Sequence, residues 1–363
     1  MLTEPASDED STEIREVIRR YLSDRFPSER VRELALTAEG YAPDDWKHMS
    51  EMGWPALGIG EEAGGAGYGA VQQCVLHEEA GRALVPGPLL ASVGFALPAL
   101  EACGGADAAE LITRLTAGDG IAALVQDGHQ ARLTVHVQDG PLRIDGVADL
   151  VLDGQSAAVL VVVSETSNGP VVLTVDAAVD GVTVTPVAVV DSTRRFARVE
   201  FSGAPANLLP IQSRSRLASA RDVTSLFVAA QMVGGAGRAV ELTLDYLRDR
   251  HQFGRPIGSF QALKHRAADM AVSVALAREL VYSAAELLAA EAWDDLGVAA
   301  PAALLRGATV YQAATEEGIQ LHGGIGFTEE HDIGLYYRRA IVDRDLCGPP
   351  VDVQERLART LIA

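Results

Sequence analysis

Two stretches of the chain combine cationic, amide, aromatic and glycine residues in a way that suits a phosphate-bearing ligand. The first is Arg250–Gln261, with the sequence RHQFGRPIGSFQ. Arg250 offers a rigid fork of donors that matches a pyrophosphate, and Gln252 can add a hydrogen bond. Phe253 offers a flat apolar face for an adenine or a ribose. Taken alone, such a short motif is equally compatible with an ordinary connector between two helices.

The second stretch is Gln320–Phe327, with the sequence QLHGGIGF. Its glycines permit positive φ angles and let backbone amides approach a ligand closely. A single glycine pattern would be weak evidence, whereas two specified stretches in a fixed order make a coincidence hard to sustain. The pair therefore indicates a loop site for a pyrophosphate-bearing ligand.

Composition narrows the class of protein. The chain has 363 residues, 48% of them hydrophobic, and a formal net charge of −20. An acidic surface argues against a nucleic-acid partner, because it would not neutralise phosphates. We expect no membrane segment, since no apolar run approaches the roughly 20 residues of a span. The acidic N-terminus is unlike a secretory signal, and the three cysteines lack metal-ligand spacing, so we expect free thiols and a cytoplasmic location.

The elements that position these stretches fall into three segments. Residues 1–118 are predicted to be mainly helical. Residues 119–208 are rich in Val, Thr and turn signals, which predicts a compact antiparallel β-domain. In residues 209–363 apolar residues recur at helical spacing, which predicts long helices packed as a bundle. The expected fold class is α+β, and this order excludes a βαβ dinucleotide-binding fold.

The order and separation of the two stretches resemble the C-terminal half of the acyl-CoA dehydrogenase family. Two earlier patterns are similar to that family as well: Gly60–Gly67 resembles its PEE-GG-G loop, and His77–Arg82, HEEAGR, resembles the helix that follows. The resemblance implies a flavoenzyme that oxidises the Cα–Cβ bond of an acyl-CoA thioester. It also implies that FAD lies between two chains, its ring on one β-domain and its adenosine diphosphate end on the neighbour's loops. The residues that would bind FAD in this chain are Arg250, Gln252, Phe253, Gln320, Gly323, Gly324 and Gly326.

The middle segment departs from the family's pattern. Leu124–Arg132 stands where the family carries T-E-P-x-A-G-S-D, and it lacks that motif. Asp145–Asp153 stands where the family carries N-G-x-K-W-x-I-T-N. The tryptophan that stacks on the flavin falls on Asp149, and the threonine near flavin N5 falls on Leu152. Both contacts with the flavin ring are therefore predicted to be lost.

The base that abstracts the α-proton is also missing. One family position for this glutamate falls on Cys347 and the other on Thr224. A thiol, with a reference pKa of about 8.5, is a poor substitute for a carboxylate. We expect the nearby acids to be solvated or capping residues; these are Asp222, Asp343 and Asp345. No catalytic residue and no metal site are predicted.

The chain is thus interpreted as similar to the non-catalytic subunit of a heterotetrameric acyl-CoA dehydrogenase. A homologous catalytic subunit would supply the base and the ring pocket, and the acyl-CoA substrate would bind in the complex. Two alternatives stay open. One is a self-sufficient homo-oligomeric dehydrogenase with an unorthodox base, and the other is a flavin-free scaffold or binding protein of the same fold.

Overall fold

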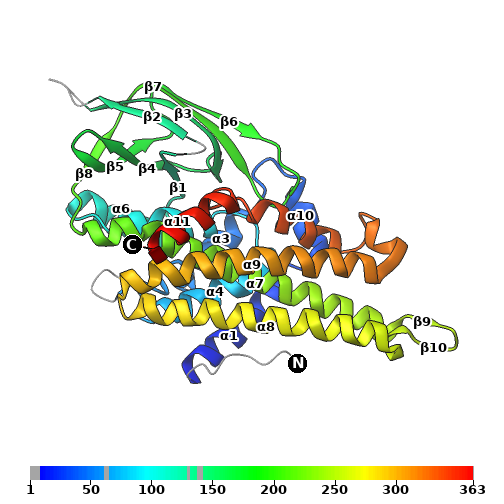
Figure 1. Cartoon of the computed structure of the whole chain (residues 1–363). Coiled ribbons are helices and arrows are strands. Elements are labelled where there is room, and N and C mark those ends of the chain that lie inside the picture. Colours follow the sequence, from blue (N-terminus) through cyan, green and yellow to red (C-terminus); the bar gives the residue numbers. More distant parts are fainter. Residues whose placement is uncertain (1–8, 61–64, 129–130, 137–141, 363) are drawn as a thin grey trace. The chain divides into compact units, whose positions relative to one another are not determined.

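The computed structural model describes residues 9–60, 65–128, 131–136 and 142–362 (Figure 1). The chain divides into two compact units. The first contains Met1–Arg32, Ala70–Val85 and Ser225–Ala363, and the second contains Glu33–Gly69 and Pro86–Thr224. Each unit is therefore assembled from separate stretches of sequence. The boundaries expected after residues 118 and 208 divide the chain along its length and stay a prediction.

The first unit is helical. Its elements are α1 (Glu9–Arg25), α2 (Ser28–Ala35, in part), α4 (Ala70–Arg82), most of α7 (Arg214–Asp249), the short strands β9 (His251–Gln252) and β10 (Arg255–Pro256), α8 (Gln261–Ala289), α9 (Trp293–His322), the 3-10 turn η5 (Gly323–Phe327), α10 (Ile333–Asp343) and α11 (Pro350–Ile362). Helix α9 begins at Trp293 and continues through Pro301.

Helix α7 has the apolar composition of a core helix. It is long and apolar enough to cross a membrane by length and hydropathy alone, but 94% of its most apolar window is buried inside the structure. A helix that is apolar all round belongs in a protein core. Its glycines allow close packing: a Cβ on Gly234 would lie 1.8 Å from the Glu78 carbonyl oxygen of α4. The two helices therefore meet backbone to backbone.

A buried ion-pair network joins α1, α4 and α8. Glu78 on α4 accepts from Arg15 at 2.9 Å, from Arg278 at 2.7 Å and from the Tyr282 hydroxyl at 2.6 Å. Each of these four side chains is less than a tenth exposed. Burial alone would raise the pKa of Glu78, but Arg278 and Arg15 outweigh burial and hold it well below its ordinary value. The carboxylate is therefore the common anion of three helices.

The second unit combines short helices with two sheets. Its elements are α3 (Pro43–Glu51), the 3-10 turn η1 (Trp54–Ala56), the π-helical turn η3 (Leu89–Ala96), α5 (Leu97–Leu100), α6 (Ala106–Thr116), β1 (Ala122–Gln126), β2 (Ala131–His136), β3 (Arg143–Leu152), β4 (Val159–Thr166), β5 (Gly169–Asp176), β6 (Val182–Val187), β7 (Phe196–Pro205), β8 (Asn207–Leu209) and the start of α7.

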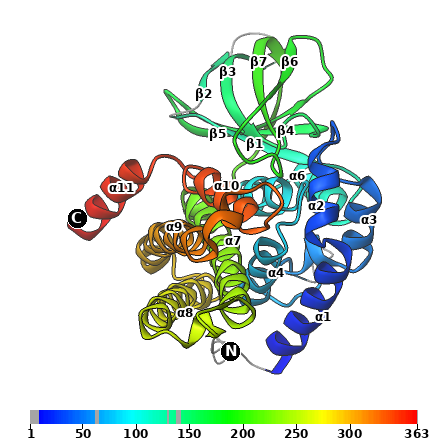
Figure 2. The same ribbon diagram turned by 90° about the vertical axis from the view of Figure 1, so that its right-hand side faces the viewer.

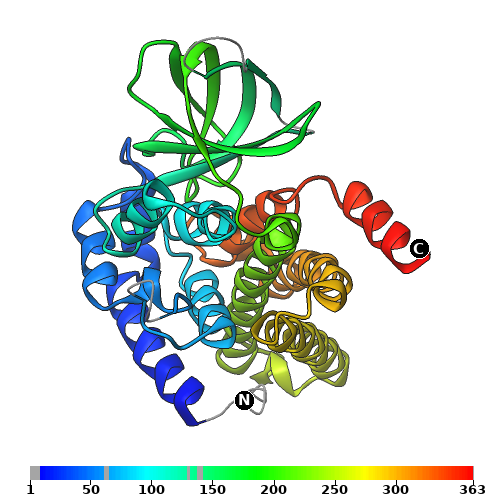
Figure 3. The same cartoon turned by 90° about the vertical axis from the view of Figure 1, so that its left-hand side faces the viewer.

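The two sheets of this unit face each other (Figure 2). Their orders are β1-β4-β5-β8 and β2-β3-β7-β6, and the core between them includes Ile144, Leu160 and Val199, each 0% exposed. The β1-β4-β5-β8 sheet packs its other face on α5 and α6 through residues such as Leu100 and Val161. Figure 3 shows these helices, in cyan, beneath the sheet. Burial on both faces explains the continuous apolar run of β4.

The α+β fold class is confirmed, with an N-terminal helical region, a middle β-region and C-terminal helices. One detail of the prediction for the β-region was wrong. The sheets are not purely antiparallel, because β1 pairs with β4 in parallel, Ala122 opposite Val159. The physical reason is the path of the chain: β2 and β3 belong to the opposite sheet, so the chain leaves and returns between β1 and β4.

Candidate functional site

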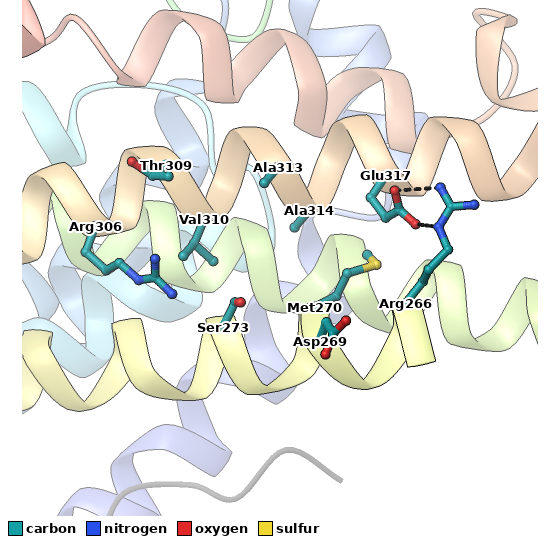
Figure 4. A pocket seen from close by; sticks show the side chains of 10 residues that line it. All are labelled: Arg266, Asp269, Met270, Ser273, Arg306, Thr309, Val310, Ala313, Ala314 and Glu317. Atoms are coloured by element: carbon teal, nitrogen blue, oxygen red, sulfur yellow. Dashed lines mark hydrogen bonds and ion pairs between the residues drawn. The ribbon is translucent and has the colours of Figure 1, made fainter. Parts of the chain in front are cut away.

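The two stretches singled out in the sequence lie at one end of the helical unit. The Tyr246 ring, near the end of α7, packs on the His322 ring at the end of α9 with their centroids 4.6 Å apart. Arg266, near the start of α8, donates to Glu317, near the end of α9, at 2.7 Å (Figure 4). These contacts bring the α7–α8 connection and the α9–α10 connection to the same end of the bundle.

The first stretch folds into a tight hairpin rather than an irregular loop. Strands β9 and β10 pair Gln252 with Arg255, and the Ile257 N–H closes the loop on the Arg250 carbonyl at 2.8 Å. The tip is Phe253 and Gly254, which have φ angles of 53° and 80°. The Arg255 guanidinium stacks over the Phe260 ring at 4.1 Å from its centroid. The base of the hairpin is therefore fixed, and its tip projects.

The predicted binding side chains of this hairpin face solvent. Phe253 is 91% exposed, and its ring meets only the edge of Phe260, at 6.2 Å between centroids. Arg250 and Gln252 are exposed too, and within the described part of the chain neither side chain has a hydrogen-bond or ion-pair partner. The guanidinium, the amide and the aromatic ring of this hairpin are thus exposed together and available to an external ligand.

The second stretch forms the end of α9 and the turn η5. Gln320 lies exposed on the last turn of α9, and its carbonyl accepts from the Gly323 N–H. Gly323 has a φ of 64°, and a Cβ on Gly326 would lie 2.6 Å from the Ile319 carbonyl oxygen, so the fold itself requires both glycines. Gly324 is different, because its φ is ordinary and a Cβ there would meet no atom within 4 Å. Open space at Gly324 suits the close approach of a ligand.

The β-region lacks a flat aromatic wall at the position aligned with the family's tryptophan. Asp149 is 62% exposed and accepts from Arg198 of β7 at 2.7 Å, and Arg198 also donates to Glu200 at 2.7 Å. Leu152, at the aligned threonine position, is 6% exposed and belongs to the apolar core opposite Phe196. An ion-paired surface and a core leucine thus stand where the resemblance places contacts with a flavin ring. His129 and Gln130, within Leu124–Arg132, lie outside the described residues, as do Glu61–Gly64 of the glycine-rich loop.

Neither aligned base position carries a carboxylate. Cys347 is 8% exposed in the segment after α10, and Thr224 is 5% exposed on α7. Cys347 is buried and forms no disulfide within the described residues. The expectation of solvated acids was right for Asp345, which is 46% exposed beside Arg344, but wrong for two residues.

Those two residues are Asp222 and Asp343, which are only 6% and 1% exposed. Asp222 lies on α7, which is buried on most sides, so a polar residue there has no solvated face to occupy. Asp343 ends α10 one helical turn after Arg339, which is also 1% exposed. Both acids have partners within the chain. They are therefore buried groups rather than solvated ones.

Helices α8 and α9 also enclose a groove of about 330 Å³ (Figure 4). Its floor is apolar, with Met270, Val310 and Ala314, and Arg306 lies at the end away from Arg266 and Glu317. None of the binding residues predicted from the sequence lines this groove. Within the described residues, no group of three or more His, Cys, Asp or Glu side chains is placed to hold a metal ion.

Comparison with known proteins places the chain in a family. It matches the acyl-CoA dehydrogenase N-terminal domain over residues 8–119 and the acyl-CoA dehydrogenase C-terminal domain over residues 218–351. It is 35% identical to the acyl-CoA dehydrogenase IpdE2 of Mycobacterium tuberculosis over 345 residues, which cover 95% of each chain. The chain belongs to the acyl-CoA dehydrogenase family. Family membership makes it a member of a group of oxidoreductases and confirms the resemblance found in the sequence.

Solved acyl-CoA dehydrogenase structures show the same fold. A variant of the Tcur3481–Tcur3483 steroid ACAD superposes with a TM-score of 0.89 at 26% identity, covering 98% of each chain. A chain of the ChsE4–ChsE5 complex from Mycobacterium tuberculosis superposes with a TM-score of 0.89 at 24% identity, covering 99% of each chain. The second likeness, at its lower identity, supports the fold alone.

Sequence reasoning missed three parts of the site. It did not bring together His322 and His331, whose rings lie 4.1 Å apart beside the glycine loop. It also overlooked Tyr246, which joins the two loops, and Arg198, which neutralises Asp149. Contacts between residues distant in sequence leave no local pattern, so no signal in the sequence could have identified these three.

Proposed function

We propose that this acyl-CoA dehydrogenase is the non-catalytic subunit of an FAD-dependent enzyme that introduces an α,β double bond into an acyl-CoA thioester. A homologous catalytic chain would provide the base and the pocket for the flavin ring. This chain would complete the same FAD site with Arg250, Gln252, Phe253, Gln320, Gly323, Gly324 and Gly326. The assembly would be a heterotetramer, and we place it in the cytoplasm.

The observation that carries the proposal is the state of Phe253. A bulky residue with a φ of 53° is uncommon, and such strain costs roughly 1–3 kcal/mol. The strained backbone holds a ring that is 91% exposed, which forgoes the stabilisation that burial would give. Both features are unfavourable for the isolated chain. They become useful if the ring packs against a ligand or a partner, as the family resemblance implies for the adenosine end of FAD.

The other end of the cofactor does not fit this chain. A flavin ring needs a flat apolar wall and hydrogen-bond donors, whereas the aligned wall position holds the ion-paired, solvated Asp149. The aligned hydroxyl position holds the core residue Leu152. The residues that suit a pyrophosphate are thus present and those that suit the ring are replaced. This division supports a shared cofactor rather than one that the chain binds alone.

The chemistry divides in the same way. In the complex, FAD would supply the acceptor for the hydride that leaves Cβ. A carboxylate of the partner would accept the α-proton, since Cys347 and Thr224 offer none. The part left to this chain is to bind the diphosphate: Arg250 pairs with its charge, Gln252 adds a hydrogen bond, and Gly324 leaves space for close approach.

One relative supports a partner and a class of substrate. The Tcur3481–Tcur3483 enzyme, which is 26% identical to this chain, is described by a pair of names and as a steroid ACAD. We propose by analogy that this chain also pairs with a different dehydrogenase subunit and that its complex accepts a bulky acyl-CoA of the steroid type. The fold itself would serve other acyl groups equally well.

The test is the flavin content of the purified chain and of its complex. The chain is purified alone and then co-expressed with a homologous dehydrogenase subunit that has the glutamate, and flavin per chain is measured from visible absorbance. We expect almost no flavin and no acyl-CoA oxidation by the chain alone, and both properties in the complex. About one flavin per isolated chain, with normal turnover, would refute the proposal.

One observation favours a self-sufficient enzyme as the second candidate. Asp222 and Asp343 are buried carboxylates, and each offers a candidate base within this chain itself. If either is the base, Asp222→Asn or Asp343→Asn abolishes turnover by the pure chain.

A flavin-free scaffold differs from the shared FAD site in what it predicts for the binding loop: Arg250→Ala would leave the flavin content of any complex unchanged.

A further inference from the structure

The turn η5 is held at its far side by an unusual helix cap. Helix α10 begins at Ile333, and its N-cap residue Asp332 makes no side-chain cap hydrogen bond. The Asp332 carboxylate is turned elsewhere, because it accepts from the Ser28 hydroxyl at 2.6 Å and from Arg32 at 2.5 Å. The Ile333 N–H donates instead to Nδ1 of His331, at 3.2 Å. A histidine thus does the work that an aspartate usually does at a helix start.

The His331 ring also packs against the end of α9. Its centroid lies 4.1 Å from that of His322, which is 2% exposed and in turn packs on Tyr246. The Nδ1 of His322 contacts the Gly318 carbonyl at 2.7 Å, so the His322 ring is fixed. Between these two histidines runs Gly323–Phe327, the glycine loop itself. The loop is therefore bounded by a fixed ring at one end and a capping ring at the other.

This cap works only while His331 is neutral. A neutral imidazole with its proton on Nε2 has a lone pair on Nδ1 that can accept the Ile333 N–H. Protonation places a proton on Nδ1, so two donors would face each other. The imidazolium would also lie at the positive end of the α10 dipole. Both effects oppose the cap, and both act on the loop through the same ring.

The charges around His331 agree with a neutral ring. The groups that face it are His322 of α9, Arg32 of α2 and Asp332 beside α10, with Tyr246 of α7 behind His322. Burial lowers the pKa of His331, the nearby His322 and Arg32 lower it further, and Asp332 opposes them. Burial likewise lowers the pKa of His322, against the carbonyl oxygens of Gly318 and Leu242. The lowered pKa of His331 means that the folded state, with the cap in place, disfavours the imidazolium. Protonation therefore favours release of the loop as the pH falls below about 6.5, the ordinary pKa of histidine.

We propose that His331 is a positioning residue for the diphosphate-binding loop: its neutral ring caps α10 and holds Gly323–Phe327 in place, and its protonation releases the loop. The inference rests on the proposed function in one respect, that this loop holds FAD. The consequence for the complex is loss of FAD at mildly acidic pH without unfolding of the chain.

The test compares three forms of the full chain by hydrogen exchange of the segment 323–335. In the wild type, we expect protection, corrected for intrinsic exchange, to fall about fivefold between about pH 7.5 and about pH 5.5, the effect of losing one helix cap. In His331→Asn the asparagine side-chain oxygen can accept the hydrogen bond from the Ile333 N–H, and the amide does not titrate. Protection should therefore not change with pH in this variant. In His331→Ala protection should be low at both values. Equal pH profiles for the wild type and His331→Asn would overturn the inference.

A second readout separates this inference from the proposed function. FAD retained by the co-expressed complex is measured over the same pH range with the wild type and His331→Asn. If retention falls with pH in the wild type but not in His331→Asn, both proposals are supported. If exchange behaves as expected while retention ignores it, the loop does not hold FAD, and the proposed function fails although the role of His331 stands.

Discussion

The ring of Tyr246 packs on the ring of His322 with 4.6 Å between centroids, and this contact makes one site out of two distant loops. Tyr246 lies one helical turn before Arg250, and His322 immediately precedes Gly323. The stacked pair therefore fixes the end of α7 against the end of α9. Arg266 and Glu317 add a second tie between the neighbouring helices. Within the described residues the side chains of Arg250 and Gln252 have no partner, so they can be changed without disturbing these contacts.

The first prediction concerns Arg250. In the complex, Arg250→Ala should weaken FAD binding about ten- to a hundredfold, because it removes a charge-assisted hydrogen bond to the diphosphate. Arg248→Ala is the matched control, since Arg248 is a 68% exposed arginine two residues away that pairs with Asp245 on its own helix. Flavin content after gel filtration measures the difference. Equal flavin in the two variants would favour the scaffold over the shared site.

The second prediction separates two neighbouring glycines. Gly324→Ala meets open space and should leave the free energy of unfolding within about 0.5 kcal/mol, while reducing flavin content in the complex. Gly326→Ala places a methyl 2.6 Å from the Ile319 carbonyl oxygen and should destabilise the chain by about 1–3 kcal/mol. Urea unfolding and flavin absorbance are measured on both variants. A stable Gly324→Ala variant with full flavin content would show that this glycine has no ligand to accommodate.

The third prediction concerns the missing ring contact. Leu152→Thr restores the family's residue, but it places a hydroxyl in an apolar core and removes packed methyl groups. We expect a loss of about 2–4 kcal/mol in unfolding free energy. Leu150→Thr, on the same strand at a 37% exposed position, should change it by less than about 1 kcal/mol. A neutral result for Leu152→Thr, by urea unfolding, would mean that this position still tolerates a polar contact.

The sequence predicted the position of the α7–α8 connection better than it predicted the surroundings of the candidate site. Gly254, Gly258 and Gln261 mark the α7–α8 connection by local backbone chemistry, and local rules carry over directly into the structure. Asp222 was misjudged because periodicity identifies an apolar stripe only on an amphipathic helix. Helix α7 is buried on most sides, so its polar residues have no solvated face that a pattern could reveal.

The same limit applies to pairings across the fold. The parallel register of β1 and β4 and the capping of α10 by His331 both depend on where distant segments return. Asp332 directly precedes α10, but its carboxylate accepts from Ser28 and Arg32, which are distant in the sequence. Spacing alone cannot supply such information.

The last prediction concerns the buried ion-pair network of Glu78 rather than the binding loops. Glu78→Gln leaves Arg15 and Arg278 without their common anion in a buried setting, and breaking such a network costs about 3–5 kcal/mol. Glu355→Gln is the control. The pair of Glu355 with Arg359 is exposed, so this substitution should change stability by about 1 kcal/mol or less.

The pH dependence of the Glu78 effect has a definite sign. The pKa of Glu78 is lowered in the folded state, so its stabilisation is complete above about 4.5 and declines as the pH falls below that value. Urea unfolding from neutral pH downwards should therefore show a gap between wild type and Glu78→Gln that narrows only in acid. A gap of constant size, or none at neutral pH, would contradict the role assigned to this carboxylate.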